Sequence, residues 1–120
     1  MAGGETGWQR VQLVERGDIY FVDLDPTAGR EQRGHRPVIV VSPAAFNALG
    51  VQLVAPITNG GNFARHRGFA VELTNIKTTG IILCNQLRTV DIAARNGRLV
   101  ERAPEAVIED MLARIATLVT

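Results

Sequence analysis

The stretch VIVVSPAAFNALGVQLVAPI, residues 38–57, holds two apolar runs separated by a segment of turn-forming residues. VIVVS (38–42) is apolar on both faces, which predicts a central and buried strand. PAAFNALG (43–50) begins with proline and ends with glycine, an order that favours one or two helical turns. VQLVAPI (51–57) predicts the next strand. Short apolar runs separated by turn residues are typical of a small antiparallel β domain and not of alternating β and α units.

Further runs of the same kind lie on both sides of this stretch. DIYFVDL (18–24) is rich in aromatic and β-branched residues, and GFAVEL (68–73) predicts another strand. GIILCNQLRTVD (80–91) is long enough to bend around a barrel corner. So many strands in one short chain must curl on themselves. We therefore predict a mostly β fold, a small antiparallel barrel with a short helix at 43–50.

The period of the sequence changes at the C-terminus. In PEAVIEDMLARIATLVT (104–120) apolar residues recur at intervals of three and four, which predicts a helix with one apolar face. Pro104 suits the first helical position, while Glu105 and Arg114 lie near the ends of the helix dipole that favour their charges. We expect the helix to close the barrel or to pack on the sheet. Its apolar face consists of Val107, Ile108, Met111, Leu112, Ile115, Leu118 and Val119.

Length and composition restrict the organisation of the chain. With 120 residues and 46% hydrophobic content, it is predicted to form a single domain at 16–120 after a flexible tail at 1–15. The tail lacks the basic start and apolar run of a signal peptide, and no membrane span is indicated, so we expect a cytoplasmic protein. Cys84 is the only cysteine, which excludes an intrachain disulfide, and we interpret it as a small core residue.

Basic residues gather in two segments between predicted strands, although the net charge of the chain is only +1. PTAGREQRGHRP (26–37) holds three arginines, one glutamate and one histidine, and TNGGNFARHRG (58–68) adds arginine, histidine and phenylalanine. Such a mixture is typical of single-stranded RNA recognition, because bases stack on rings and phosphates accept forked hydrogen bonds. The alternative is a pair of solvated connections whose charges serve only solubility.

Two strings in these segments, D-P-T-x-G-x-E-Q…R-P and T-x-G-G-N-F-A-R, resemble the MazF/PemK family of toxins from toxin–antitoxin pairs. The likeness runs from about residue 16 to the end and is strongest to the PemK/Kid and ChpB branches. It implies a homodimeric, SH3-like barrel that cuts single-stranded mRNA at short sequences without a metal. It also implies 2′,3′-cyclic phosphate and 5′-hydroxyl products, inhibition of translation and growth, and silencing by a cognate antitoxin.

In the expected reaction, the 2′-hydroxyl of the RNA attacks the adjacent phosphorus. This step needs a base for the 2′-hydroxyl, donors for the charged transition state and a proton for the leaving 5′ oxygen. Glu31, the only acid in the first basic segment, is the candidate base or the group that orients it, unless it only pairs with Arg36. Arg36 would grip the phosphate and Thr58 would donate its hydroxyl to a phosphate oxygen. The resemblance implies that Glu, Arg and Thr at these same three positions form the active site in the MazF-like branch. Candidate RNA contacts are Arg30, Gln32, Arg33, His35, Asn59, Asn62, Phe63, Arg65, His66, Asn85 and Arg88.

The sequence departs from the Kid-like branch, in which an Asp, an Arg and a His are associated with catalysis. Asn85, Leu83 and Arg30 occupy the matching positions. Asn85 cannot transfer a proton and Leu83 cannot hold a phosphate, so that form of the mechanism cannot operate here. We expect Glu31, Arg36 and Thr58 to carry cleavage and Asn85 to read a base edge.

Other sites and functions are less well supported by the sequence. Two separated histidines and one distant cysteine give no metal-ligand spacing, and we expect neither a metal nor a cofactor. A CcdB-like gyrase poison is expected to engage its target through a C-terminal tryptophan, whereas this chain ends in LVT and its only tryptophan is Trp8. A module that binds RNA or the antitoxin without cutting is the remaining alternative.

Overall fold

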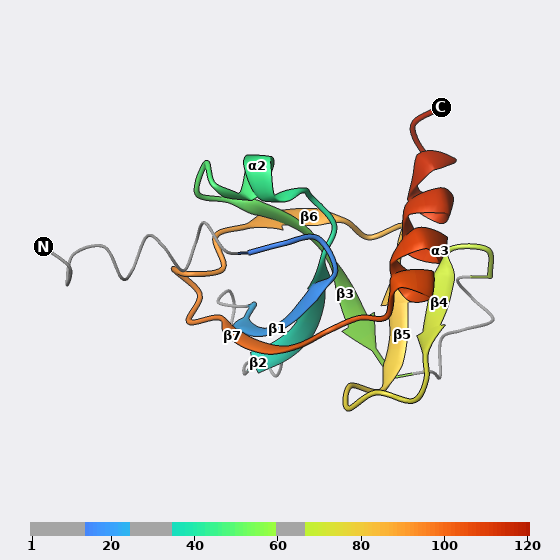
Figure 1. Cartoon of the computed structure of the whole chain (residues 1–120), viewed down its shortest axis with the longest axis horizontal. Helices are drawn as coiled ribbons and strands as arrows, with labels where there is room; N and C mark the ends of the chain where they lie inside the picture. Colours follow the sequence, from blue (N-terminus) through green and yellow to red (C-terminus); the bar gives the residue numbers. More distant parts are fainter. Residues whose placement is uncertain (1–13, 25–34, 60–66) are drawn as a thin grey trace, which may run out of the picture.

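The computed structural model describes residues 14–24, 35–59 and 67–120, and this part of the chain forms one curled, seven-stranded sheet with two helices (Figure 1). The path of the sheet is β4-β5-β3-β2-β1-β7, and β6 pairs with β3 beside β5. All the strand pairs are antiparallel, as predicted. The elements are β1 (Asp18–Asp23), β2 (His35–Val40), α2 (Ala44–Asn47), β3 (Gln52–Thr58), β4 (Ala70–Leu73), β5 (Gly80–Leu83), β6 (Arg88–Val90), β7 (Arg98–Arg102) and α3 (Glu105–Ala116).

Strand β3 lies at the centre of the sheet and carries three neighbours. One edge pairs with β2, from Val38↔Pro56 to Val40↔Val54. The other edge pairs first with β6 and then with β5. The predicted strand at 80–91 therefore bends as expected, but it is not continuous, because a turn after Leu83 separates its two halves.

Successive strand residues point to opposite faces of the sheet, so separate buried clusters form on its two faces. On one face, which we call the α3 face, Ile19, Ile39 and Ile57 pack in one cluster with Ile108 and Met111 of α3. On the second face, buried valines form a separate cluster with Ile92 of the connection between β6 and β7. These valines are Val14, Val22, Val38, Val40, Val54 and Val90. A third, small cluster of Ala70, Ile81 and Leu83 joins β4 to β5.

Helix α3 is shorter than the predicted 104–120, since it ends at Ala116, but its predicted orientation is confirmed. Ile108 and Met111 are buried, whereas Leu118 and Val119 beyond the helix end are exposed. Cys84 is also buried in this core, and burial raises the pKa of its thiol to about 11. The thiol is therefore protonated at neutral pH, and the position of Cys84 in the core is the one that the sequence analysis expected.

Strand β7 was not predicted. It pairs with β1 from Asp18↔Arg102 to Phe21↔Arg98, with a register shift at Ile19/Tyr20. Most of the predicted tail, residues 1–13, lies outside the described residues. Val14 is buried, so the packed part of the chain includes residues ahead of the predicted domain start at 16.

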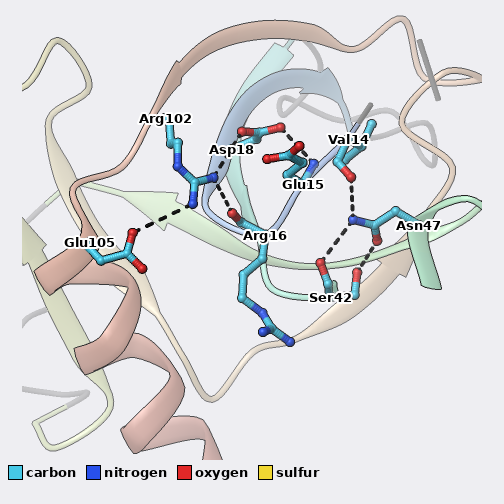
Figure 2. A network of polar contacts seen from close by, with 8 residues as sticks. All are labelled: Val14, Glu15, Arg16, Asp18, Ser42, Asn47, Arg102 and Glu105. Carbon is cyan, nitrogen blue, oxygen red and sulfur yellow. Dashed lines mark hydrogen bonds and ion pairs between the residues drawn. The ribbon is translucent and has the colours of Figure 1, made fainter. Parts of the chain in front are cut away.

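A buried polar cluster, formed by Ser42, Asn47 and Gln52, joins α2 to the strands around it. Figure 2 shows its Ser42 and Asn47 members. The Asn47 amide donates to the carbonyl oxygens of Val14 and Ser42 at 2.9 and 3.0 Å, and its own oxygen accepts from the Ser42 hydroxyl. Gln52 donates to the Asn47 carbonyl at 3.1 Å and accepts from the Ile92 amide at 2.9 Å. Because each buried side chain is satisfied, the cluster stabilises the fold instead of straining it.

A second polar contact joins the start of β1 to the end of β7. Asp18 accepts a hydrogen bond from the Glu15 amide at 2.9 Å and pairs with Arg102 at 3.7 Å (Figure 2). Burial nevertheless raises the pKa of Asp18, which shows that desolvation outweighs these favourable contacts. No helix in the described part of the chain is long and apolar enough to cross a membrane.

Candidate active site

Arg36 and Thr58 lie on neighbouring strands and on the same face of the sheet. Both belong to the second face, because they alternate with Pro37 and Ile57. The ladder between β2 and β3 ends at Val38↔Pro56, and each of the two residues lies two positions beyond that pair. Arg36 is exposed and Thr58 is half-buried, so a cationic and a hydroxyl donor stand together where the covered core ends.

The backbone of Thr58 is fixed from the neighbouring strand. Thr58 pairs with Ile81 of β5. Gly80, the residue before Ile81, has a φ of +125°. A Cβ atom on Gly80 would lie 2.2 Å from the carbonyl oxygen of Thr58. Only glycine permits both this backbone angle and this approach, so Gly80 at the start of β5 lets the two strands pair closely at Thr58.

Eight of the candidate residues fall outside the part of the chain that the structure describes. Of the remaining ones, Arg36, Thr58 and the adjoining Asn59 lie at facing ends of the paired strands β2 and β3. Asn59 is exposed directly after β3. The candidates outside the described residues are Glu31, Arg30, Gln32, Arg33, Asn62, Phe63, Arg65 and His66.

Arg88 and Asn85 are the described candidates that follow β5 in the chain. Arg88 is exposed on β6 opposite Val54, which is four residues and therefore about 13 Å of strand from Thr58. Asn85 is exposed in the turn after β5. Leu83 is only 3% exposed, and it occupies the position at which the Kid-like branch is expected to hold a phosphate-binding arginine.

His35 precedes Arg36 in the sequence but points to the α3 face. Its ring stacks on Phe21 of β1, with a centroid distance of 5.8 Å and an interplanar angle of 29°. The guanidinium carbon of Arg98 on β7 lies 5.7 Å from the same phenyl centroid. The sequence analysis missed Phe21 and Arg98, because it did not predict the strand that brings Arg98 beside β1.

The end of β1, where the first basic segment begins, is held by the connection between β6 and β7. The Arg95 guanidinium donates to the carbonyl oxygen of Asp23 at 3.0 Å, and the Asp23 amide donates to the Arg95 carbonyl at 3.1 Å. Arg95 therefore fixes the backbone from which the segment carrying Glu31 departs. Within the described residues, no group of three or more His, Cys, Asp or Glu side chains is arranged to hold a metal ion.

Comparison with known proteins gives the context for this geometry. Residues 15–119 match a family model described as PemK-like, MazF-like toxin of type II toxin–antitoxin system. The chain belongs to this toxin family. Among curated PemK/MazF relatives, the endoribonuclease PemK of Escherichia coli is 50% identical over 97% of this chain and 94% of its own length. The endoribonuclease toxin ChpB of Escherichia coli is 47% identical over 88% and 93% of the two chains.

Solved structures of MazF proteins share the fold. MazF of Deinococcus radiodurans superimposes with a TM-score of 0.73 at 28% identity, covering 87% of this chain and 94% of its own. A MazE–MazF complex from the same organism gives a TM-score of 0.76 at 28% identity, covering 87% and 93%. The predicted β-barrel class and the predicted PemK/MazF family are both confirmed by these matches.

Proposed function

We propose that this PemK/MazF family member cuts single-stranded mRNA at short sequences, and that the second face around Arg36 and Thr58 holds the cleaved phosphate. The chain is a type II toxin of the endoribonuclease class, by its family and by its named relatives. The main support for this site is the position of Arg36 and Thr58, whose guanidinium and hydroxyl groups lie on adjacent strands, on the same face of the sheet and at the edge of the core. The rival reading as a gyrase poison has no comparable support.

The chemistry assigns one task to each group. Glu31 accepts the proton of the 2′-hydroxyl as its oxygen bonds to phosphorus, and the bond from phosphorus to the 5′ oxygen breaks. Arg36 and Thr58 donate to the phosphate oxygens, whose negative charge grows in the transition state. The leaving 5′ oxygen takes up a proton, which Arg36 or water supplies. The products are a 2′,3′-cyclic phosphate and a 5′-hydroxyl, and the steps need no metal.

The remaining candidate contacts are assigned to binding. Asn59 adjoins Thr58 and suits the nucleotide next to the cut, while Asn85 and Arg88 lie further away and suit base-edge and phosphate contacts respectively. The candidates outside the described residues belong to the two basic segments that flank Arg36 and Thr58 in the sequence.

A cognate antitoxin is the expected protein partner, since a MazF relative has been solved in complex with MazE. We infer that the active form is a homodimer, for which the exposed Leu118 and Val119 beyond α3 are available contacts. Sedimentation at micromolar concentration tests this, and a monomer would contradict it. Because the substrate is mRNA, the protein acts in the cytoplasm.

Cleavage of a defined single-stranded RNA by the purified protein in EDTA tests the function. We expect cuts at a short recurring sequence, with ends that carry a 2′,3′-cyclic phosphate and a 5′-hydroxyl. The same RNA with 2′-deoxyribose at the cut position should resist cleavage, because the attacking oxygen is missing. Intact RNA, 3′-hydroxyl ends or cutting of the deoxy substrate would each overturn the proposal. The Arg36→Ala variant, prepared in parallel, controls for contaminating nuclease.

A further inference from the structure

The α3 face carries an exposed stack of three side chains that the proposed cleavage does not use. Phe21 is half-exposed at the middle of the stack, and His35 and Arg98 are both exposed. On the same strand and the same face, Ile19 is fully buried in the core that α3 covers. The cover of the sheet therefore ends between Ile19 and Phe21, and beyond that point an aromatic ring, an imidazole and a guanidinium face outward.

We propose that Phe21, His35 and Arg98 form a platform that stacks one base of the RNA substrate, at a nucleotide away from the cut. This inference rests on the proposed RNA-cutting function and assigns a subsite to it. Phe21 lies between His35 and Arg98 and stacks with both, so the exposed imidazole at one end of the stack offers a base the stacking surface that single-stranded RNA binders use. The guanidinium at the other end offers a donor for the adjoining phosphate. The platform is also joined directly to the cleavage site, since His35 and Arg36 are consecutive.

The charges around the stack favour a base over a phosphate at its centre. Asp23 lies opposite His35 in the ladder between β1 and β2. A carboxylate at that position repels a phosphate placed over the imidazole, whereas an uncharged base is not repelled. Arg98 lies opposite Phe21 on the other side of β1, so the positive charge stands at the β7 edge of the platform.

The platform and the phosphate site must take different nucleotides, because His35 and Arg36 point to opposite faces of the sheet. Proteins that bind single strands typically contact about 4–16 nucleotides, so a base on the far side of the strand end is within the expected footprint. Loss of the platform should therefore weaken substrate binding and leave the chemical step intact.

The test compares Phe21→Leu with the parental protein on RNAs built around a mapped cut site and shortened one nucleotide at a time from each end. Stacking on an aromatic ring corresponds to a change of about 5- to 150-fold in affinity. We expect Phe21→Leu to raise the KM for the longest RNA by this factor while kcat is unchanged. Removing the stacked nucleotide should abolish the difference between the two proteins.

Matched variants separate stacking from folding and from charge. Phe46→Leu removes an exposed phenyl ring from α2, outside both sites, and should leave the KM unchanged. Arg98→Lys keeps the charge but loses the planar group, and should raise the KM less than Phe21→Leu does; it also serves as the test if Phe21→Leu does not fold. An unchanged KM for Phe21→Leu on the longest RNA would overturn the platform. So would a difference that persists on the shortest RNA that is still cut.

The outcome for the platform can be distinguished from the outcome for the function. If the parental protein binds the RNA without cutting it, the proposed function has failed, and fluorescence anisotropy with the same RNAs tests the platform directly. A weaker Kd for Phe21→Leu but not for Phe46→Leu would then support it, and equal Kd values would overturn it.

Discussion

Strand β2 has polar residues at both of its ends, and the two ends are built differently. Beyond its C-terminal end, Ser42 and Asn47 are buried and each polar group has a partner within the chain. At its N-terminal end, His35 and Arg36 are exposed. Buried and satisfied polar groups contribute to the free energy of folding, whereas exposed donors at the edge of a core are available to a ligand. The comparison predicts that substitutions at one end alter stability and those at the other alter activity.

The largest effect is expected for Glu31→Gln, which alters the segment that leads into the exposed end of β2. Without a group that accepts the proton, cleavage should slow by about 10²–10⁴-fold while the melting temperature is unchanged. Single-turnover cleavage of a mapped RNA measures the rate. A variant that cuts at the parental rate would show that Glu31 is not the base.

Arg36→Ala should have the second largest effect. We expect kcat to fall by about 10²–10³-fold, because a donor to the transition state is missing. The guanidinium is exposed, so the free energy of unfolding should change by no more than about 0.5 kcal/mol. Urea titration and cleavage kinetics on the same preparation check both values. A large loss of stability would contradict the division between the two ends of β2.

Asn47→Ala should have the opposite effect to Arg36→Ala, with lower stability and unchanged cleavage. The substitution leaves the carbonyl oxygens of Val14 and Ser42 without their donor and opens a cavity, at a cost of about 2–4 kcal/mol in the free energy of unfolding. Cleavage per folded molecule should be retained. Gln86→Ala, which removes an exposed amide, is the control and should cost less than about 0.5 kcal/mol. Equal stability of the two variants would show that the buried cluster contributes nothing.

The sequence predicted the fold better than it predicted the site, for physical reasons. Local apolar patterns indicated the strands from β1 to β5 and the helix α3, because each buries a continuous face of its own residues. Strand β7 was missed because RLVER is largely charged and becomes a strand only through pairing with the distant β1. The interruption after Leu83 also depends on partners, since both halves of that segment pair with β3.

The candidate site also depends on long-range strand pairing that the sequence does not reveal. The chemistry of the basic segments singled out Arg36 and Thr58, but their placement on one face depends on the register between β2 and β3, which no local pattern reveals. The separation of His35 from Arg36 follows from strand alternation once β2 is known to begin at His35. The stack on Phe21 needs two long-range pairings at once, and residue types alone do not predict it.

The smallest effect is expected at Glu101, which joins β7 to the segment before β5. Its carboxylate accepts hydrogen bonds from the Thr78 amide and hydroxyl, both at 2.7 Å, and from the Lys77 amide at 3.2 Å. Desolvation acts to raise the pKa of Glu101, but these hydrogen bonds outweigh it and the pKa is lowered. Because the group is partly exposed, we expect Glu101→Gln to cost only about 1 kcal/mol at pH 7.

The pH dependence of this cost gives the sharper test. A carboxyl whose pKa is lower in the folded state stabilises the protein above its unfolded pKa, near 4.5, and loses that contribution as the pH falls through the folded value. The difference in unfolding free energy between the parental protein and Glu101→Gln should therefore be complete at pH 7 and shrink below about pH 4. Urea titrations at both pH values measure it. A difference that stays constant with pH would mean that the charge of Glu101 does not stabilise its contact with Lys77 and Thr78.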